Sequence, residues 1–203
     1  MQVKKPNFYS VIIGTELLNG RRKDAHFAFL NQQLLSRGWE QKASFVIADD
    51  TNLMENIFNL IKSDPNSVMF CFGGIGATPD DYTREVAGKV FTNGKMEFHE
   101  EAKNRILNQF GEESYPHRIN MAYLPINAKL LTNVVNNVAG FYLEDRFFFT
   151  PGFPSMSQAM VIEALDKLYP KSNIEKYRKV MTINASENDL IDTMKKIPEN
   201  IDL

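Results

Sequence analysis

Residues that can hold a phosphate group gather between positions 67 and 81. An apolar run from Ser67 to Phe72 is followed by three glycines and then two carboxylates: Gly73, Gly74, Gly76, Asp80 and Asp81. Glycine has no Cβ and readily takes positive φ angles, so backbone N–H groups in such a turn can come close to a phosphate or a pterin. Adjacent carboxylates repel that anion unless a divalent cation lies between them. The segment indicates either a metal-assisted phosphate site or an ordinary connection between a strand and a helix.

The residues after this turn predict a helix over 83–91. Thr78, Asp80 or Asp81 is expected to cap it, because side-chain oxygens of these types accept hydrogen bonds from the first N–H groups of a helix. The N-terminal end of a helix carries partial positive charge, which favours a bound anion. The helix would therefore add to the affinity of the glycine turn for phosphate.

Three further apolar runs also end at glycines or polar residues, listed here in chain order: Gly14, Thr15 and Glu16; Asp49 and Asp50; Pro151 and Gly152. Glu16 either hydrogen-bonds a ribose or pterin or simply closes its own loop. Asp50 is either a ligand-binding group or the N-cap of the next helix.

Apolar periodicity in the first half of the chain predicts strands that alternate with helices. Strands are expected at 8–14, 39–48 and 67–72, and helices at 24–37, from Thr51 to the break at Pro65, and at 83–91. This order is typical of a mostly parallel sheet covered by helices on both faces. Ligands in such sheets bind beyond the carboxyl ends of the strands, which places the glycine and carboxylate segments along one edge.

The second half of the chain is less regular. We expect a helix at 99–110, strands at 129–132, 140–143 and 147–150, and a helix that Ser155 caps and that ends at Leu168. Residues 1–170 would form the main domain. Residues 171–203 would form a linker, a strand at 177–185 and a helix at 187–196. This tail either packs on the main domain or begins a second, incomplete domain.

Composition narrows the function classes. The chain has 203 residues, 43% of them hydrophobic, and a net charge of −2. No basic patch with interleaved aromatic residues supports nucleic-acid binding, and no apolar stretch reaches the ~20 residues that span a membrane. A signal-type apolar region is not seen, and the single cysteine, Cys71, lies in an apolar run, which fits a core residue in a reducing compartment. We expect a cytoplasmic protein.

Four segments, in the same order along the chain, resemble the molybdopterin-binding (MoaB/Mog-type) domain family, and in particular its competence/damage-inducible protein A (CinA) branch. They are Gly-Thr-Glu-Leu-Leu-Asn-Gly at 14–20, Asp49-Asp50, the glycine and carboxylate segment 73–81 with Thr83, and Pro-Gly-Phe-Pro at 151–154. The resemblance covers roughly residues 7–168 and departs from the family pattern at His26, where asparagine is usual, and at Val138-Ala139.

The resemblance implies a three-layer α/β/α fold, homo-oligomers, and Mg²⁺ with molybdopterin or an adenine nucleotide as ligand. In the CinA branch the equivalent domain is associated with metal-dependent hydrolysis of ADP-ribose, so we expect hydrolysis of such a phosphoanhydride. The alternatives are a molybdopterin adenylyltransferase and a pterin-binding or oligomerising module without catalysis.

Residue roles follow from the family motifs. Asp81 is expected to hold the metal and act in catalysis, with Asp80 as a second metal ligand and Asp49 as a second catalytic group. The expected ligand-binding residues are Gly14, Thr15, Glu16, Gly73, Gly74, Gly76, Thr78, Pro151 and Gly152. The run Phe147-Phe148-Phe149 indicates either a self-association surface or a central strand covered on both faces.

Overall fold

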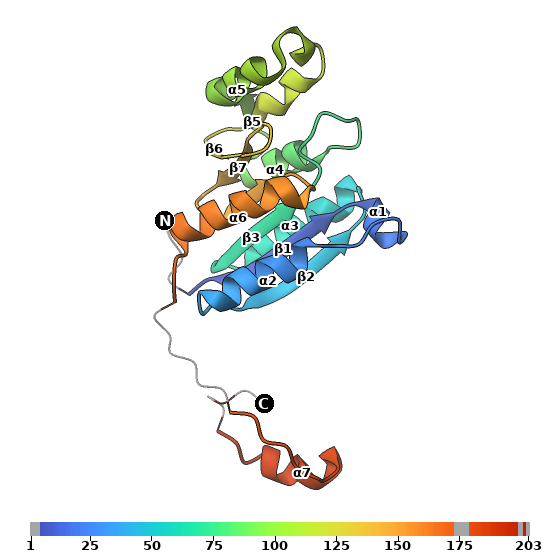
Figure 1. The fold of residues 1–203 in the computed structure, drawn as a ribbon, viewed down its shortest axis with the longest axis vertical. Helices are drawn as coiled ribbons and strands as arrows, with labels where there is room; N and C mark the ends of the chain where they lie inside the picture. The colour runs from blue at the N-terminus through green and yellow to red at the C-terminus, as the bar shows by residue number, and fades with distance from the viewer. Residues whose placement is uncertain (1–4, 173–178, 199–200, 202–203) are drawn as a thin grey trace.

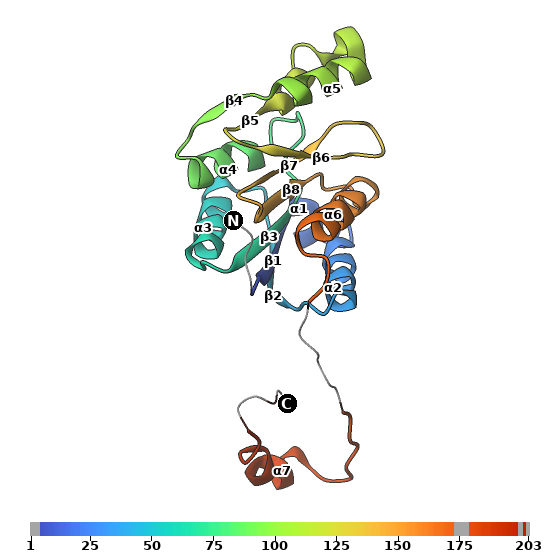
Figure 2. The same ribbon diagram turned by 90° about the vertical axis from the view of Figure 1, so that its left-hand side faces the viewer.

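A computed structural model describes residues 5–172, 179–198 and 201. A six-stranded sheet lies between two layers of helices, which Figure 2 shows edge-on. This is the three-layer α/β/α fold expected from the sequence. In the described part of the chain, no helix is both long and apolar enough to cross a membrane.

The sheet is mixed, with a parallel half and an antiparallel half. Its order is β2 (Gln41–Ile47), β1 (Asn7–Ile13), β3 (Ser67–Phe72), β8 (Phe147–Thr150), β7 (Gly140–Leu143) and β6 (Lys129–Leu131). Strands β2, β1, β3 and β8 run parallel, and β7 and β6 pair antiparallel. The four parallel strands therefore end at the same edge of the molecule (Figure 1).

Two helices cover each face of the sheet. Helices α3 (Thr51–Ser63) and α4 (Thr83–Phe91) pack on one face, and α2 (His26–Ser36) and α6 (Pro154–Leu168) pack on the other. Successive side chains of β1 point to opposite faces of the sheet and contribute to both cores. Val11 belongs to the core under α3 and α4, and Ile12 belongs to the core under α2 and α6. Cys71 is fully buried, as expected of a core residue.

The phenylalanine run on β8 lies in the middle of the sheet and is completely buried. Phe147 and Phe149 face α3 and α4, whereas Phe148 faces α2 and α6. The run is thus a central strand covered on both faces, and it provides no self-association surface. The expectation of an oligomer formed through these residues is therefore wrong.

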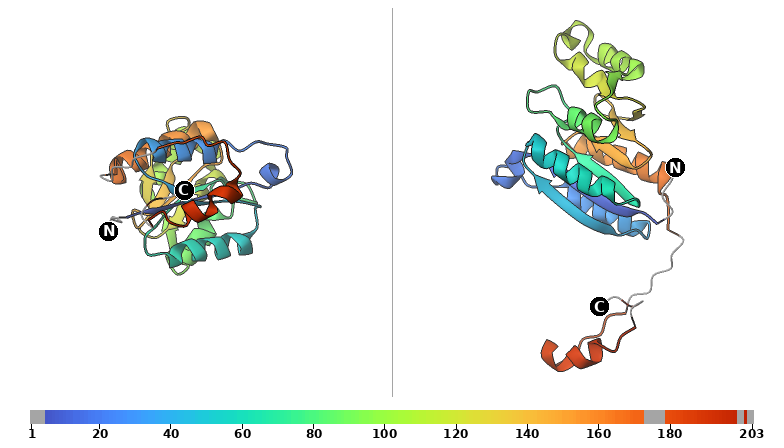
Figure 3. Two further views of the ribbon diagram at one scale, coloured as in Figure 1. Left: turned by 90° about the horizontal axis from the view of Figure 1, so that it is seen from below. Right: turned by 180° about the vertical axis from the view of Figure 1, so that it is seen from behind.

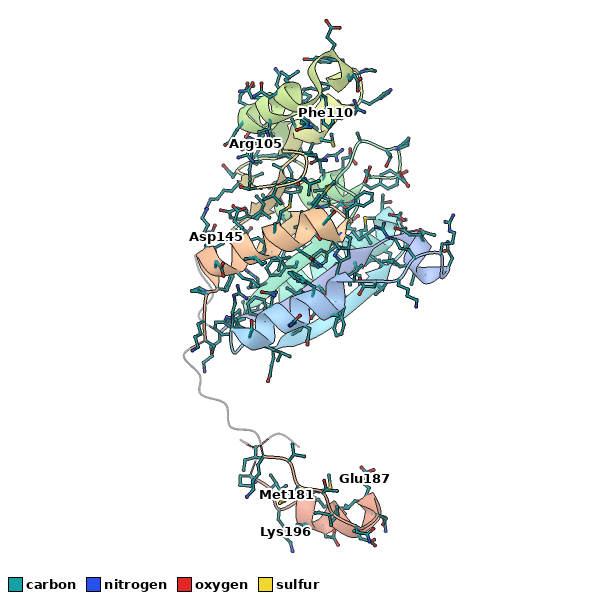
Figure 4. The ribbon with its side chains drawn as sticks, viewed as in Figure 1. Arg105, Phe110, Asp145, Met181, Glu187 and Lys196 are labelled. Atoms are coloured by element: carbon teal, nitrogen blue, oxygen red, sulfur yellow. The ribbon has the colours of Figure 1, made fainter. Side chains whose placement is uncertain are left out.

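A small peripheral unit follows α4 and was missed by the sequence analysis, apart from its helix. Strands β4 (Met96–Phe98) and β5 (Tyr123–Pro125) pair antiparallel, and α5 (Glu100–Phe110) lies beside two short 3₁₀ helices, η1 (Gly111–Ser114) and η2 (Arg118–Ala122). Arg105 and Phe110 mark α5 in Figure 4. The Arg118 guanidinium lies 4.5 Å from the centre of the Phe110 ring and joins η2 to α5.

Two further expectations differ from the structure, and one short helix was not predicted. Helix α6 begins at Pro154 with Phe153 as its N-cap, so Ser155 does not cap it. A short helix, α1 (Thr15–Leu18), follows β1 directly. In the tail, residues 177–178 lie outside the described residues, and 179–185 form no strand; α7 (Glu187–Met194), red in Figure 3, is the helix predicted there.

Candidate functional site

The loops after the four parallel strands meet at one edge of the sheet. Gly14 N donates to Ile47 O over 3.0 Å, which joins the ends of β1 and β2. Gly73 N donates to Thr150 O over 2.9 Å, which joins the ends of β3 and β8. The four predicted segments therefore lie at neighbouring strand ends, as the topology of parallel sheets requires.

The glycine loop after β3 needs residues without side chains. Gly73 and Gly74 have φ angles of 104° and 69°, which favour glycine. A Cβ at Gly73 would lie 2.6 Å from the carbonyl oxygen of Ile13. The loop therefore runs against the end of β1 with no room for a side chain.

Two residues at the start of α4 hold this loop in place. Thr83 Oγ1 donates to Gly73 O over 3.0 Å. Arg84 is only 6% exposed, and its Nη1 donates to Ile75 O over 2.5 Å and also to Gly76 O. Burial lowers the pKa of Arg84 from its ordinary value. Arg84 is not evident as a site residue from the sequence, because the residues around it do not show whether the arginine points inward or is exposed.

The same loop contains four consecutive backbone N–H groups that are free to donate hydrogen bonds to a ligand. Those of Gly74, Ile75, Gly76 and Ala77 have no hydrogen-bond acceptor among the described residues. Successive unpaired N–H groups in a glycine-rich loop are a known arrangement for binding anions. The loop can thus offer several hydrogen bonds to one phosphate.

Asp81 stabilises the outer part of this loop. Its Oδ2 accepts hydrogen bonds from the backbone N–H of Thr78, over 2.8 Å, and from the Thr78 hydroxyl. Helix α4 has Tyr82 as its N-cap and no side-chain capping bond. The expectation that Thr78, Asp80 or Asp81 caps α4 is therefore wrong; the carboxylate of Asp81 closes its own loop instead.

A cleft of about 410 Å³ opens beside Asp81. One side consists of the glycine-loop segment and α4, and the other consists of the peripheral unit. Its lining residues are Ala77, Thr78, Pro79, Asp81, Tyr82, Arg84, Glu85, Phe98, Asn120 and Tyr123. The volume lies within the range of small-molecule sites.

The predicted site residues divide between this cleft and a second, much smaller hollow. Thr78 and Asp81 line the cleft, whereas Glu16 and Gly152 line a hollow of about 20 Å³ together with His26. The remaining predicted residues line neither: Gly14, Thr15, Asp49, Gly73, Gly74, Gly76, Asp80 and Pro151. The four segments lie at one edge of the sheet, as expected, but they do not line a single hollow.

The carboxylates after β2 stabilise local structure. Asp49 Oδ2 accepts from the backbone N–H and the hydroxyl of Thr15, each over 2.8 Å, and so fixes the loop after β1. Asp50 accepts from Leu53 N over 2.7 Å and caps α3, as one of the two alternatives for that residue predicted.

His26 joins α2 to the loop that precedes α6. Its ring stacks on Phe72 with centroids 4.5 Å apart. Nε2 lies 3.2 Å from Gly152 O, so it carries the proton, and Nδ1 lies 3.3 Å from Ser157 Oγ. Burial lowers the pKa of His26, against the opposing effect of the Gly152 hydrogen bond. The residue is a buried structural group.

The donor set of the cleft fits a cation that is held partly by its substrate. Among the described residues, no three His, Cys, Asp or Glu side chains gather closely enough to hold a metal ion by themselves. Mg²⁺ is usually held by one or two carboxylates together with substrate phosphates. Asp81 and Glu85 line the same cleft and can supply those carboxylates, whereas Asp80 lies outside it.

The chain folds as an α/β/α sandwich that presents a glycine loop, unpaired N–H groups and carboxylates at its sheet edge. The family described as "Probable molybdopterin binding domain" matches residues 10–170. The chain belongs to this family.

Individual relatives agree with this assignment. The chain is 33% identical over 161 residues to a CinA-like protein of Geotalea uraniireducens, covering 75% of this chain and 37% of that protein. The crystal structure of CinA from Thermoplasma acidophilum superposes with a TM-score of 0.71 at 25% identity, covering 81% of this chain and 98% of that one. The Mog protein of Mycobacterium ulcerans shares the fold, with a TM-score of 0.51 at 15% identity, covering 80% and 93% of the two chains.

The chain spans only part of the first curated relatives that it matches. It covers 64%, 37% and 50% of the length of three of them. The chain, a member of the molybdopterin-binding domain family with CinA-like relatives, therefore corresponds to one portion of these longer proteins.

Proposed function

We propose that this chain binds a phosphate-containing nucleotide or pterin and hydrolyses a phosphoanhydride, such as that of ADP-ribose, with a divalent cation. The observation that carries the proposal is the position of Asp81. Its carboxylate lines the 410 Å³ cleft and is fixed by Thr78 at the end of the glycine loop, whose N–H groups are unpaired. Hydrolysis of an anhydride needs these two properties together, phosphate binding and a cation site.

In this proposal, different residues hold the phosphate and the cation. The N–H groups of 74–77 hold one phosphate, with Thr83 and Arg84 keeping the loop in shape. Asp81 and Glu85 hold the divalent cation, and the Thr78 hydrogen bonds keep Asp81 oriented. Bound there, Mg²⁺ would supply positive charge to the phosphate oxygens as the anhydride breaks.

Asp49 lies outside the cleft that holds the proposed ligand. Both hydrogen bonds from Thr15 go to its Oδ2, and it lines neither hollow. A catalytic role for Asp49 stays a prediction, and an Asp49→Asn variant with full activity would show that it only stabilises the loop after β1.

Transfer of an adenylyl group to molybdopterin is the second candidate. Family membership favours it, since the family is described as a probable molybdopterin-binding domain. Both reactions break a phosphoanhydride, so the same loop and carboxylates would serve. The two differ in the acceptor, which is water in one reaction and molybdopterin in the other.

One experiment compares the candidates. Purified protein is incubated with ADP-ribose, or with ATP and molybdopterin, with and without Mg²⁺, and products are separated by chromatography. We expect AMP and ribose 5-phosphate from ADP-ribose only when Mg²⁺ is present. Release of adenylylated molybdopterin instead would select the second candidate, and no product in either arm would leave a binding module.

The Asp81→Asn variant tests the role of the carboxylate. An amide keeps the size of the side chain but lacks the charge that binds a hard cation, so we expect turnover to fall roughly 100-fold or more. Thermal unfolding should change little. Asp80→Asn is the matched comparison, because its side chain lies outside the cleft; equal losses in both variants would contradict the assignment to Asp81.

A further inference from the structure

Three aromatic side chains lie on the same cleft and remain exposed. Tyr82, Phe98 and Tyr123 are 38%, 47% and 40% exposed, and all three line the 410 Å³ volume. We call these residues the aromatic wall. They come from two parts of the chain, since Tyr82 precedes α4 and the other two belong to the peripheral unit.

Phe98 and Tyr123 are partners in the β4–β5 ladder. They lie opposite each other in its register, with ring centroids 5.1 Å apart and planes inclined by 53°. Such a cross-strand pair stabilises a two-stranded ladder. Ladder stability alone, however, does not require that the rings border a cleft, because the same contact can form on either face of the two paired strands.

Apart from Ala77 and Pro79, the remaining residues that line the cleft are polar. Thr78, Asp81 and Glu85 belong to the glycine-loop and α4 side, and Asn120 of η2 adds an exposed side-chain amide. A ligand that fills the cleft therefore meets carboxylates at one part and aromatic rings at another, and Ala77, whose N–H is unpaired, lines the same cleft. A phosphate joined to a planar ring has this division of chemistry.

We propose that the aromatic wall binds the planar nitrogen heterocycle of the phosphate ligand by stacking, with the Asn120 amide hydrogen-bonding the edge of that ring. Aromatic side chains stack on bases of any sequence because every base has a π-face, and an amide can both donate to and accept from a heterocycle edge. This inference deepens the proposed function, on which it rests, by assigning a ring-binding subsite to residues outside the glycine loop.

The subsite is tested by binding and not by turnover. AMP and ribose 5-phosphate carry the same sugar phosphate and differ in the base, and neopterin, used as its monophosphate, supplies the other heterocycle. Affinities are measured by calorimetry in the presence of Mg²⁺. We expect AMP or neopterin to bind at least about tenfold more tightly than ribose 5-phosphate, the size of effect that base stacking gives. A preference for AMP identifies a nucleotide base, and a preference for neopterin identifies a pterin.

Variants of the wall provide the second measurement. A double Phe98→Leu and Tyr123→Leu variant keeps apolar bulk in exposed positions and loses the rings. It should bind the preferred heterocycle about tenfold more weakly and ribose 5-phosphate unchanged. Tyr123→Phe should keep the affinity. Phe27→Leu, an exposed aromatic position on α2 away from the cleft, is the control.

The outcomes separate this inference from the proposed function. If wild-type protein binds ribose 5-phosphate as tightly as AMP and neopterin, or binds none of the three, the ring subsite is overturned. It is also overturned if the double variant loses affinity equally for ligands with and without a ring. If the ring preference and its loss are seen but ADP-ribose is not hydrolysed, the subsite stands and the proposed hydrolysis fails.

Discussion

A single buried cation, Arg84, determines the shape of the glycine loop at the residue scale. Its guanidinium donates to two successive carbonyls, those of Ile75 and Gly76. These two hydrogen bonds fix the orientation of the peptide groups whose neighbouring N–H groups are unpaired. Arg84 also lines the cleft, so its positive charge would favour an anion bound there.

Arg84→Met is the variant that tests this. It removes both hydrogen bonds of Nη1 and leaves the buried Ile75 carbonyl and the partly buried Gly76 carbonyl without partners, which costs roughly 1–3 kcal/mol for each buried unsatisfied group. We expect AMP affinity to fall about tenfold or more along with a lower free energy of unfolding, measured by calorimetry and urea titration. Unchanged affinity in a destabilised protein would show that Arg84 only supports the fold.

At the scale of elements, His26 connects α2 to α6 through the loop that contains Gly152. The neutral ring satisfies both contacts, since Nε2 donates to Gly152 O and Nδ1 accepts from Ser157. Arg22 and Asp24 are the nearby charged groups that act on its ionisation. The buried position disfavours the charged form, which is why the pKa lies below the ordinary value.

Stability should therefore depend on pH through this residue. The unfolded chain takes up a proton on His26 near pH 6.5, before the folded protein does. Its contribution to stability is full above pH 6.5 and is lost as the pH falls toward the lower folded pKa. Urea unfolding of wild-type and His26→Asn protein from pH 7.5 to 5.5 should show a smaller decline in the variant. Parallel curves would contradict this.

The accuracy of sequence prediction differs between elements for physical reasons. The ranges of β3, β7, β8 and α4 are as predicted, because long apolar runs and helical spacing end at glycine, proline or polar residues. Strands β4 and β5 have only three residues each, and they include Glu97 and Pro125, so neither forms an apolar run that predicts a strand. Their pairing also depends on contacts between distant parts of the chain.

The residues of the candidate site were also predicted where they belong to a local motif and missed where they depend on the fold. Thr78 and Asp81 were found because they belong to a local motif, and both line the cleft. Phe98, Asn120 and Tyr123 were missed because only the folded peripheral unit brings them to that motif. The sequence likewise could not place Arg84 inside the protein, since burial of a charge depends on carbonyl partners that the fold supplies.

At the scale of the whole molecule, the tail is separable from the site. No described residue from 179 to 198 is buried, whereas Ser172 is, with its N–H bonded to Arg37 O over 2.7 Å. A protein shortened to residues 1–172 should therefore keep its melting temperature within about 2 °C and retain AMP affinity. A drop of several degrees would show that the tail packs on the main domain.

Self-association remains a prediction from the family resemblance, now without support from the buried phenylalanines of β8. Sedimentation velocity of a tag-free sample at micromolar concentration measures it directly. We expect a species larger than the 23.2 kDa monomer. A strictly monomeric result would remove the oligomer from the account of this chain.

The place of β8 in the sheet has a consequence for biosynthesis. Strand β3 pairs with β1 on one side and with β8 on the other, but β8 begins at Phe147, about 75 residues further along the chain. Until the ribosome has delivered that segment, β3 presents an apolar strand with one unpaired edge, the type of surface on which chains aggregate. The domain cannot complete its sheet by folding from the N-terminus as it emerges, so we expect nascent chains that stop before Phe147 to depend on chaperones.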